Sequence, residues 1–297
     1  MGTFGRYAPW FHMTSAGEPF SYRAWKWLAQ RRSTVGWSGD LFDRIERTPW
    51  DLLIILDACR YDTLSGISDC AVVERAISPV SATPGFLAAS AERKVFGGAD
   101  YVSANPQTNR RNPVPGGTLV DVSESGWDEH LATVPPAPVY EEALSRLDSS
   151  RPVVAHTLQP HFPHICQVGE SIVPVPGGFH PEEMDGDVDG DLKMQQALAS
   201  GKGSLRRASR SYAVATAFAW DRALAATIEA LDQGFTVCLT SDHGELFGEW
   251  GLVEHPVGVS VEKLIEVPWV VFEPRQEAAG GESPRVSERL SALGYVE

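Results

Sequence analysis

The feature that most restricts the fold is the aliphatic run Leu52-Leu-Ile-Ile-Leu56, which lies between Asp51 and Asp57. An uninterrupted run of this kind is typical of a central parallel strand that is buried on both faces. A carboxylate at the end of such a strand is costly to desolvate unless a partner compensates its charge. A divalent metal ion is one such partner for Asp57, and capping of a following helix is the alternative. For Asp62 we expect a structural role.

A second strand is predicted at residues 235–240, and it also ends in polar side chains. Ser241, Asp242, His243, Gly244 and Glu245 follow it directly, and His255 comes after a glycine-containing loop. Aspartate and neutral histidine are good ligands for divalent metals. A metal site is therefore one interpretation, and a polar turn that happens to contain a histidine is the other.

A third strand, at residues 152–158, ends in a turn that holds His161 and His164 and that two prolines stiffen. A rigid connection with solvated histidines is the simpler explanation of that turn taken alone. Polar residues now follow three aliphatic strands, and the carboxyl ends of parallel strands meet at one edge of a sheet. The pattern predicts an α/β fold with a doubly wound, mostly parallel sheet, helices on both faces and a site at that edge.

A hydroxyl-rich turn, Pro79-Val-Ser-Ala-Thr-Pro84, precedes a helical segment. Pro84 suits the first turn of that helix and places Thr83 at its N-cap. The Thr83 hydroxyl would then lie in the field of the helix dipole, where an anion is stabilised. Plain capping is the alternative role for Thr83.

The remaining pattern completes an alternating α/β chain. Further strands are expected at 71–78, 101–104, 118–122 and 267–272, and helices at 22–32, 140–147, 211–231 and 285–293. Asp221 falls on the exposed face of the helix at 211–231. Residues 165–210 are expected to be loop-like. Within them, residues 185–191 resemble the start of a calcium loop, but Gln196 stands at its twelfth position, which favours a solvated acidic insertion.

Composition limits the classes of partner. The 297 residues carry a net charge of -14, which argues against nucleic acid as a partner because phosphate backbones are held by cationic surfaces. The scattered cysteines Cys59, Cys70, Cys166 and Cys238 predict reduced thiols. No stretch approaches the roughly 18–20 apolar residues of a membrane span, and no secretory signal is visible. A cytoplasmic, acidic protein is the expectation.

Residues 1–49 form an aromatic-rich N-terminal arm, and residues 50–297 are expected to form one catalytic domain. Aromatic and basic side chains alternate in the arm between Tyr22 and Arg32. Such a segment either packs its rings onto the domain or contacts a membrane surface, and the lack of a long amphipathic period favours packing.

Taken together, the motifs resemble the alkaline phosphatase superfamily, in particular its sulfatase-like hydrolases and the related phosphoethanolamine and lipoteichoic-acid transferases. The resemblance covers roughly residues 50–273 and implies a three-layer fold. It is carried by Leu56-Asp-Ala-Cys-Arg-Tyr-Asp62, Gln159-Pro-His-Phe-Pro163, and Thr240-Ser-Asp-His-Gly-Glu245 with Gly248-Glu249 and His255. The terminal Leu290-Ser-Ala-Leu-Gly-Tyr295 is similar to sulfatase ends.

The resemblance implies that Asp57, Asp242 and His243 hold a divalent metal ion (Mn, Zn, Ca or Mg) that also contacts the nucleophile. Thr83 is the candidate nucleophile, with Ser81 as the second choice. His161 and His255 would face the oxyanion of the substrate or complete a second metal site. Glu245 and Glu249 are expected to have supporting or structural roles.

Some motifs of this sequence differ from those of known family members, and the differences limit which of the family's reactions it can catalyse. The turn before Pro84 has no cysteine and no arginine after it, so it does not match the formylglycine sulfatases. Ala58 stands where those enzymes carry a second aspartate, and no additional Asp-x3-His pair of the two-zinc phosphatases is found.

The expected function is metal-dependent hydrolysis or transfer of phosphate or sulfate esters, on small-molecule, glycan or lipid-linked substrates, through a covalent intermediate. The alternative is a non-catalytic, sulfatase-like accessory or binding protein, which Ala58 favours.

Overall fold

The structure is a computed structural model that describes residues 20–33, 39–114, 116–148, 150–178, 197–199, 201 and 203–274. Its centre is a seven-stranded sheet with the order β2-β11-β8-β1-β5-β3-β4. The strands are β1 (Leu52–Asp57), β2 (Glu74–Ile77), β3 (Asp100–Ser103), β4 (Thr118–Asp121), β5 (Val153–Pro160), β8 (Val237–Ser241) and β11 (Glu266–Phe272). The predicted fold class is confirmed.

Strand β1 lies at the middle of the sheet, as its aliphatic run predicts. It pairs in parallel with β5 on one side and β8 on the other, with Leu52 opposite both Val153 and Val237. Every residue of β1 is buried. Strand β11 pairs antiparallel to β8 and β2, so the sheet is mostly rather than wholly parallel.

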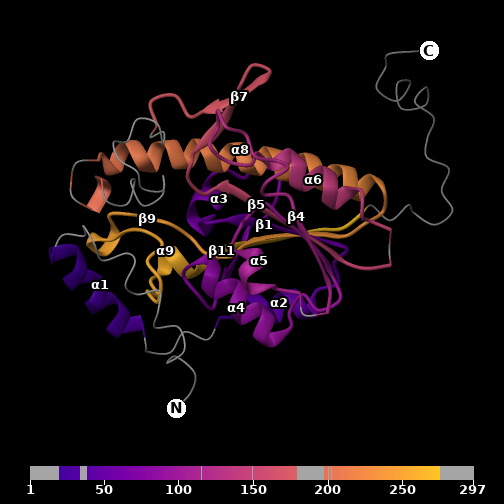
Figure 1. Cartoon of the computed structure of the whole chain (residues 1–297), viewed down its shortest axis with the longest axis horizontal. Helices are drawn as coiled ribbons and strands as arrows, with labels where there is room; N and C mark the ends of the chain where they lie inside the picture. The colour runs from indigo at the N-terminus through magenta and orange to yellow at the C-terminus, as the bar shows by residue number, and fades with distance from the viewer. Residues whose placement is uncertain are drawn as a thin grey trace, which may run out of the picture.

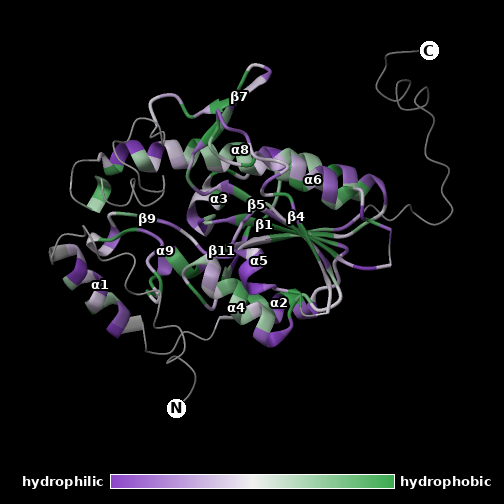
Figure 2. Cartoon of the chain, in the orientation of Figure 1, coloured by the Kyte–Doolittle hydropathy of each residue, from purple (hydrophilic) through white to green (hydrophobic). Residues whose placement is uncertain are grey.

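Helices cover both faces of this sheet (Figure 1). Side chains of β1 point alternately to the two faces of the sheet and pack into two hydrophobic cores. One core contains Leu52, Ile54 and Leu56, and the other contains Leu53 and Ile55. The first face carries α3 (Tyr61–Ile67), α6 (Pro136–Leu144) and α8 (Leu205–Asp232), and the second carries α2 (Leu41–Arg47) and α4 (Thr83–Arg93). Figure 2 shows the central strands as the hydrophobic middle layer.

Smaller elements surround the carboxyl edge of the sheet. Hairpins are formed by β6 (Ile165–Val168) with β7 (Ser171–Pro174), and by β9 (Leu246–Phe247) with β10 (Val253–Glu254). The short helices are α5 (Thr108–Arg111), η4 (Glu249–Gly251) and α9 (Glu262–Ile265). Helix α1 (Phe20–Ser33) lies beside β9 and α9 in Figure 1.

Some local expectations need correction. Thr83 is the first residue of α4 rather than its N-cap, which is Ala82. Residues 165–210 are not all loop, because they contain the β6–β7 hairpin and the start of α8. Helix α6 begins at Pro136 because proline suits a first helical turn. Asp221 is exposed, as predicted.

Some predictions fall outside the described residues, namely the acidic segment 185–191 with Gln196 and the helix at 285–293. The division of the chain at residue 49 stays a prediction, and α2 shares a core with the sheet. All four cysteines are free, as expected. Among the described residues, no helix has the length and apolar character needed to cross a membrane.

Because β1 contributes side chains to both hydrophobic cores, truncation of one of them should destabilise the fold. Ile54 is fully buried, so Ile54→Ala is expected to lower the free energy of unfolding by roughly 2–5 kcal/mol through lost burial and a residual cavity. The matched control is Val72→Ala, because Val72 is 85% exposed and its truncation should change stability by no more than about 0.5 kcal/mol. Urea unfolding of both variants measures the difference, and equal effects would contradict the assignment of β1 to the core.

Candidate active site

The residues predicted from three strand ends meet at the carboxyl edge of the sheet. Asp57 ends β1, Asp242 and His243 follow β8, and His161 follows β5. Ser241 ties two of these ends together, because its hydroxyl accepts a hydrogen bond from the Cys59 amide at 2.8 Å and donates to the His243 carbonyl at 2.6 Å. The sheet register therefore fixes the relative positions of Asp57 and Asp242.

The hydroxyl of Thr83 lies at the centre of this group. Its Oγ1 donates to Asp242 Oδ2 at 2.7 Å, and it lies 3.1 Å from His243 Nε2 and 3.4 Å from Asp57 Oδ1. The N-terminus of α4 carries Thr83 into the site, where its side chain makes no capping bond. The capping role considered from sequence is therefore wrong, and the hydroxyl faces the predicted metal ligands instead.

The donor set suits a divalent cation. Asp57 and Asp242 are both buried, and the His243 ring lies between them, with Nε2 at 3.5 Å from Asp57 Oδ1 and 3.4 Å from Asp242 Oδ2. His243 Nδ1 lies 2.8 Å from the Gly244 carbonyl oxygen, which accepts only from a protonated nitrogen. Burial, with His255 beside it, holds the pKa of His243 well below 6.5, so the Nε2 lone pair faces the carboxylates.

The electrostatics of the carboxylates lead to the same conclusion. Burial and then the Asp242 carboxylate raise the pKa of Asp57 from 3.8 to about 7. Two buried carboxylates repel each other when both are ionised, and a divalent cation relieves that repulsion. Oxygen and imidazole donors of this kind suit Mn, Zn and Mg, so Asp57, Asp242, His243 and Thr83 fit the metal that the sequence implies.

Three residues that the sequence interpretation did not single out support the site. Asn105 Nδ2 donates to Asp57 Oδ2 at 2.9 Å and orients it. His156 is fully buried in β5, its Nδ1 lies 2.9 Å from the Tyr101 hydroxyl, and its Nε2 lies 4.0 Å from Asp242 Oδ2. No described residue forms a hydrogen bond with His156 Nε2. Both residues could have been found from the sequence. His156 is a histidine within an otherwise aliphatic strand, and Asn105 is a polar residue that follows β3.

A second cluster lies beside the first and consists of His161, Glu245 and His255, whose potential ligand atoms lie within 4.8 Å of one another. The His255 ring is 4.7 Å from the His243 ring and 4.9 Å from the His161 ring, measured between centroids. His255 Nδ1 lies 3.3 Å from Glu245 Oε2. Burial alone would lower the pKa of His255, but the Glu245 carboxylate outweighs burial and raises it. Glu245 thus favours the protonated form of His255.

Other candidates lie away from this group. Ser81 donates to the Pro256 carbonyl at 3.1 Å rather than to either carboxylate of the group. His164 is buried against Ser211, with Nδ1 at 2.7 Å from the hydroxyl, so it is not solvated. Asp62 and Glu249 both form ion pairs with Arg60, which fits the structural roles expected of them.

Backbone conformation at the site explains two small residues. A Cβ on Gly244 would overlap with the Lys263 carbonyl oxygen, so only glycine fits beside His243. Ala58 has a φ of 59°, a left-handed conformation that is strained for a residue other than glycine. In that conformation the Ala58 amide donates to Asp242 Oδ1 at 3.2 Å. The family resemblance leads one to expect a second aspartate at position 58. Here Ala58 instead orients Asp242 through its backbone amide.

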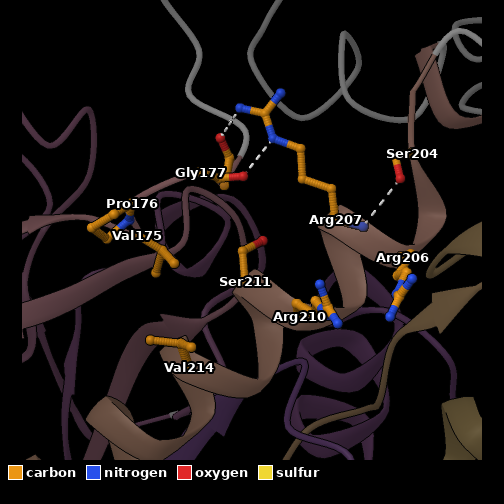
Figure 3. A pocket seen from close by; sticks show the side chains of 10 residues that line it. Val175, Pro176, Gly177, Ser204, Arg206, Arg207, Arg210, Ser211 and Val214 are labelled. Atoms are coloured by element: carbon orange, nitrogen blue, oxygen red, sulfur yellow. Dashed lines mark hydrogen bonds between the residues drawn. The ribbon is translucent and has the colours of Figure 1, made fainter.

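A separate basic hollow of about 320 Å³ lies at the N-terminal end of α8 and contains Arg206, Arg207 and Arg210 (Figure 3). Arg207 donates to the Gly177 carbonyl at 2.5 Å and to the Gly178 carbonyl. Ser211, on its wall, contacts His164. None of the residues that line the hollow belongs to the carboxylate–histidine group, so it is not the candidate active site.

Comparison with solved structures finds a similar fold in the integral membrane lipooligosaccharide phosphoethanolamine transferase A (EptA) from Neisseria meningitidis. The TM-score is 0.53 at 13% identity, covering 85% of this chain and 54% of that one. The periplasmic domain of the transferase EptC from Campylobacter jejuni matches with a TM-score of 0.45 at 17% identity over 82% of this chain and 81% of that one. A phosphonate monoester hydrolase of Agrobacterium radiobacter matches with a TM-score of 0.44 at 15% identity, over 76% and 68%.

The likeness to EptA shows that the chain shares the α/β fold of that transferase, which agrees with the fold that its motifs predict. The chain spans about half the length of that transferase. No family model matches the sequence, and no curated protein matches it.

The raised pKa of Asp57 gives a prediction for the metal-free protein. The folded pKa exceeds the ordinary 3.8, so ionisation of Asp57 destabilises the fold progressively as pH rises from 3.8 to about 7, and no further above that. Both proteins are compared in the presence of a chelator. The melting temperature of Asp57→Asn should rise relative to that of the wild type as pH increases over this range, and the difference should then level off.

Thermal denaturation across pH measures this difference. Adding Mn or Zn should raise the melting temperature of the wild type, because a ligand that binds the folded state stabilises it. The gain should be much smaller for Asp57→Asn. A difference between the two proteins that does not change with pH would contradict the raised pKa.

Proposed function

We propose that this chain is a metal-dependent enzyme that transfers phosphoryl or sulfuryl groups from ester substrates to Thr83 and then to water or an acceptor alcohol. The single observation that carries the proposal is the position of Thr83 Oγ1, within 2.7–3.4 Å of Asp242, His243 and Asp57. A threonine hydroxyl is a weak nucleophile at neutral pH, and activation needs a neighbouring base or a metal. The Thr83 hydroxyl lies beside residues that fit both.

Asp57, Asp242, His243 and Thr83 would hold the metal ion. When bound, a divalent cation lowers the pKa of a coordinated hydroxyl and neutralises negative charge on phosphoryl or sulfuryl oxygens. Asn105 holds Asp57 in position, and the Ala58 amide does the same for Asp242. These bonds keep both carboxylates directed at Thr83 without requiring a rearrangement during the reaction.

The cluster of His161, Glu245 and His255 supplies the proton. In the proposed first step, Thr83 Oγ1 passes its proton to Asp242, to which it already donates, and forms a bond to phosphorus or sulfur as the bond to the leaving oxygen breaks. His255, whose protonated form Glu245 favours, donates to that oxygen. In the second step water or an alcohol attacks the Thr83 ester, and the neutral imidazole of His255 accepts the proton of the attacking group. The bond from phosphorus or sulfur to Thr83 Oγ1 breaks, and Oγ1 regains its proton from Asp242. The enzyme is a hydrolase if the acceptor is water and a transferase if it is an alcohol.

The EptA and EptC matches are named phosphoethanolamine transferases, and the Agrobacterium radiobacter protein is named a phosphonate monoester hydrolase. Phosphate esters are therefore the first substrates to test, followed by sulfate esters. The cytoplasmic location expected from the sequence remains a proposal.

The nucleophile is tested by comparing Thr83→Ala with Ser81→Ala. Purified protein with Mn, Zn, Mg or Ca is expected to cleave an aryl phosphate mono- or diester, or an aryl sulfate. Thr83→Ala should reduce turnover by at least about 10³-fold, because it removes the group that forms the covalent intermediate. Ser81→Ala should retain most of the activity, because the Ser81 hydroxyl bonds the Pro256 carbonyl instead.

Mass spectrometry of the quenched wild-type reaction should find the phosphoryl or sulfuryl group on the peptide that contains Thr83. Turnover that survives Thr83→Ala would remove Thr83 from the mechanism. Metal bound by the wild type, with no turnover and no adduct from any ester, would instead support the non-catalytic alternative.

A further inference from the structure

The basic hollow at the start of α8 has two kinds of wall (Figure 3). Arg206 and Arg210 lie toward one side of it, and Val175, Pro176 and Val214 lie toward the other. We call the second group the apolar wall. Val214 is 44% exposed, so part of this wall is open to a ligand. Small-molecule sites are commonly lined in this way, with apolar surface for contact and a few polar groups that fix orientation.

Two of the three arginines in the hollow have no partner within the part of the chain that the structure describes. Arg206 and Arg210 are both exposed, and no described residue forms a hydrogen bond or an ion pair with either. Arg207 differs, because its guanidinium donates to the carbonyl oxygens of Gly177 and Gly178 on the rim. Arg206 and Arg210 therefore present two guanidinium groups that an external anion can reach.

The position of these arginines on α8 is unfavourable for the helix itself. Arg206 and Arg210 are four residues apart, so their like charges are neighbours on one helix face and repel each other. Three arginines stand among the first six residues of α8 and its first turn has no acidic residue, although the helix dipole favours acidic residues at this end. The chain has 39 acidic residues, so their absence here is not a matter of composition. A bound anion would relieve the repulsion.

Guanidinium chemistry indicates which anion. The planar fork of an arginine binds two oxygens of a phosphate or sulfate group at once, and it stays charged at every physiological pH. Forks on consecutive helical turns suit one such group held by both. The hollow has a volume of about 320 Å³, and a bare ion between the arginines would leave the apolar wall uncovered. An organic anion covers that wall with its carbon skeleton.

We propose that the hollow is a second, non-catalytic binding site for a small organic phosphate, phosphonate or sulfate. Arg206 and Arg210 hold its anionic group, and the apolar wall contacts its organic part. This inference goes beyond the proposed function and does not depend on it, because none of the candidate metal ligands lines the hollow.

The hollow nevertheless adjoins the segment that carries His161. Ser211, on its wall, has its hydroxyl 2.7 Å from His164 Nδ1, and the Val175 amide donates to the His164 carbonyl at 2.9 Å. A ligand in the hollow therefore contacts residues that hold this turn in place. Amide hydrogen exchange of the full chain should show slower exchange in residues 172–178 and 204–215 when the ligand binds, which locates the site.

Isothermal titration calorimetry with phenylphosphonate tests the site. This probe joins an anionic group to an apolar ring and has no ester bond to cleave, and a chelator keeps it from binding to a metal in the candidate active site. Arg206→Gln/Arg210→Gln should weaken binding by about tenfold or more, because hydrogen bonds to charged groups are among the strongest in proteins. The matched control is Arg47→Gln/Lys94→Gln, which removes two exposed cations from the ends of α2 and α4 and should bind as the wild type does.

The organic part of the ligand is tested by Val214→Ser. Inorganic phosphate should bind the wild type several-fold more weakly than phenylphosphonate does, because it cannot contact the apolar wall. Val214→Ser should weaken the binding of phenylphosphonate several-fold and leave that of inorganic phosphate unchanged. Equal affinity of the wild type for the two probes would overturn the organic ligand.

Thermal denaturation distinguishes a ligand site from a structural cluster of arginines. In a buffer free of oxyanions, Arg206→Gln/Arg210→Gln should melt at or above the wild-type temperature, because the repulsion is gone. Phenylphosphonate should raise the melting temperature of the wild type and not that of the variant. A lower melting temperature of the variant without any anion would assign the arginines to contacts within the chain and overturn the proposal. Absence of binding by the wild type, or equal losses in the two double variants, would overturn it as well.

Discussion

The repulsion between two buried carboxylates, Asp57 and Asp242, is the constraint on which the rest of the site depends. Burial denies them the solvation that separated carboxylates have at a surface, and their position at adjacent strand ends prevents them from moving apart. Burial and then the Asp242 carboxylate raise the pKa of Asp57 to about 7. A divalent cation would relieve this repulsion, and His243 and Thr83 lie beside the pair as further potential donors.

The scaffold around this pair is built to resist that repulsion. Tyr212 of α8 uses its hydroxyl twice, accepting from the Arg60 amide at 2.8 Å and donating to the Ala58 carbonyl at 2.7 Å. The turn after β1 is therefore fixed to a long helix, which stabilises the strained Ala58 conformation. Because Arg60 also pairs with Asp62 and Glu249, the β9–η4 segment is tied to the same turn. The two carboxylates are held in place by bonds outside the site itself.

The same segment connects the site to the molecular surface. His255 lies between the two residues of the segment that bond α1, and its ring contacts those of His161 and His243. The sequence leaves packing onto the domain and contact with a membrane surface as alternatives for the N-terminal arm, and the structure shows the packing. Tyr22 and Ala29 pack onto the domain, while Trp25 and Trp27 face outward. A helix has two sides, so packing of the arm does not exclude an exposed surface.

The sequence by itself determined the sheet and most of the metal-ligand candidates. Aliphatic runs such as Leu52–Asp57 are long enough to specify buried strands, and parallel strands carry their terminal polar residues to a common edge. Only the tertiary structure decided between Thr83 and Ser81 as the group that faces those ligands, because two residues in one turn direct their hydroxyls by packing rather than by spacing. It also added His156 and Asn105, whose strands meet β1 only through nonlocal pairing. The local sequence specifies each strand end, whereas the order of strands across the sheet specifies which ends are neighbours.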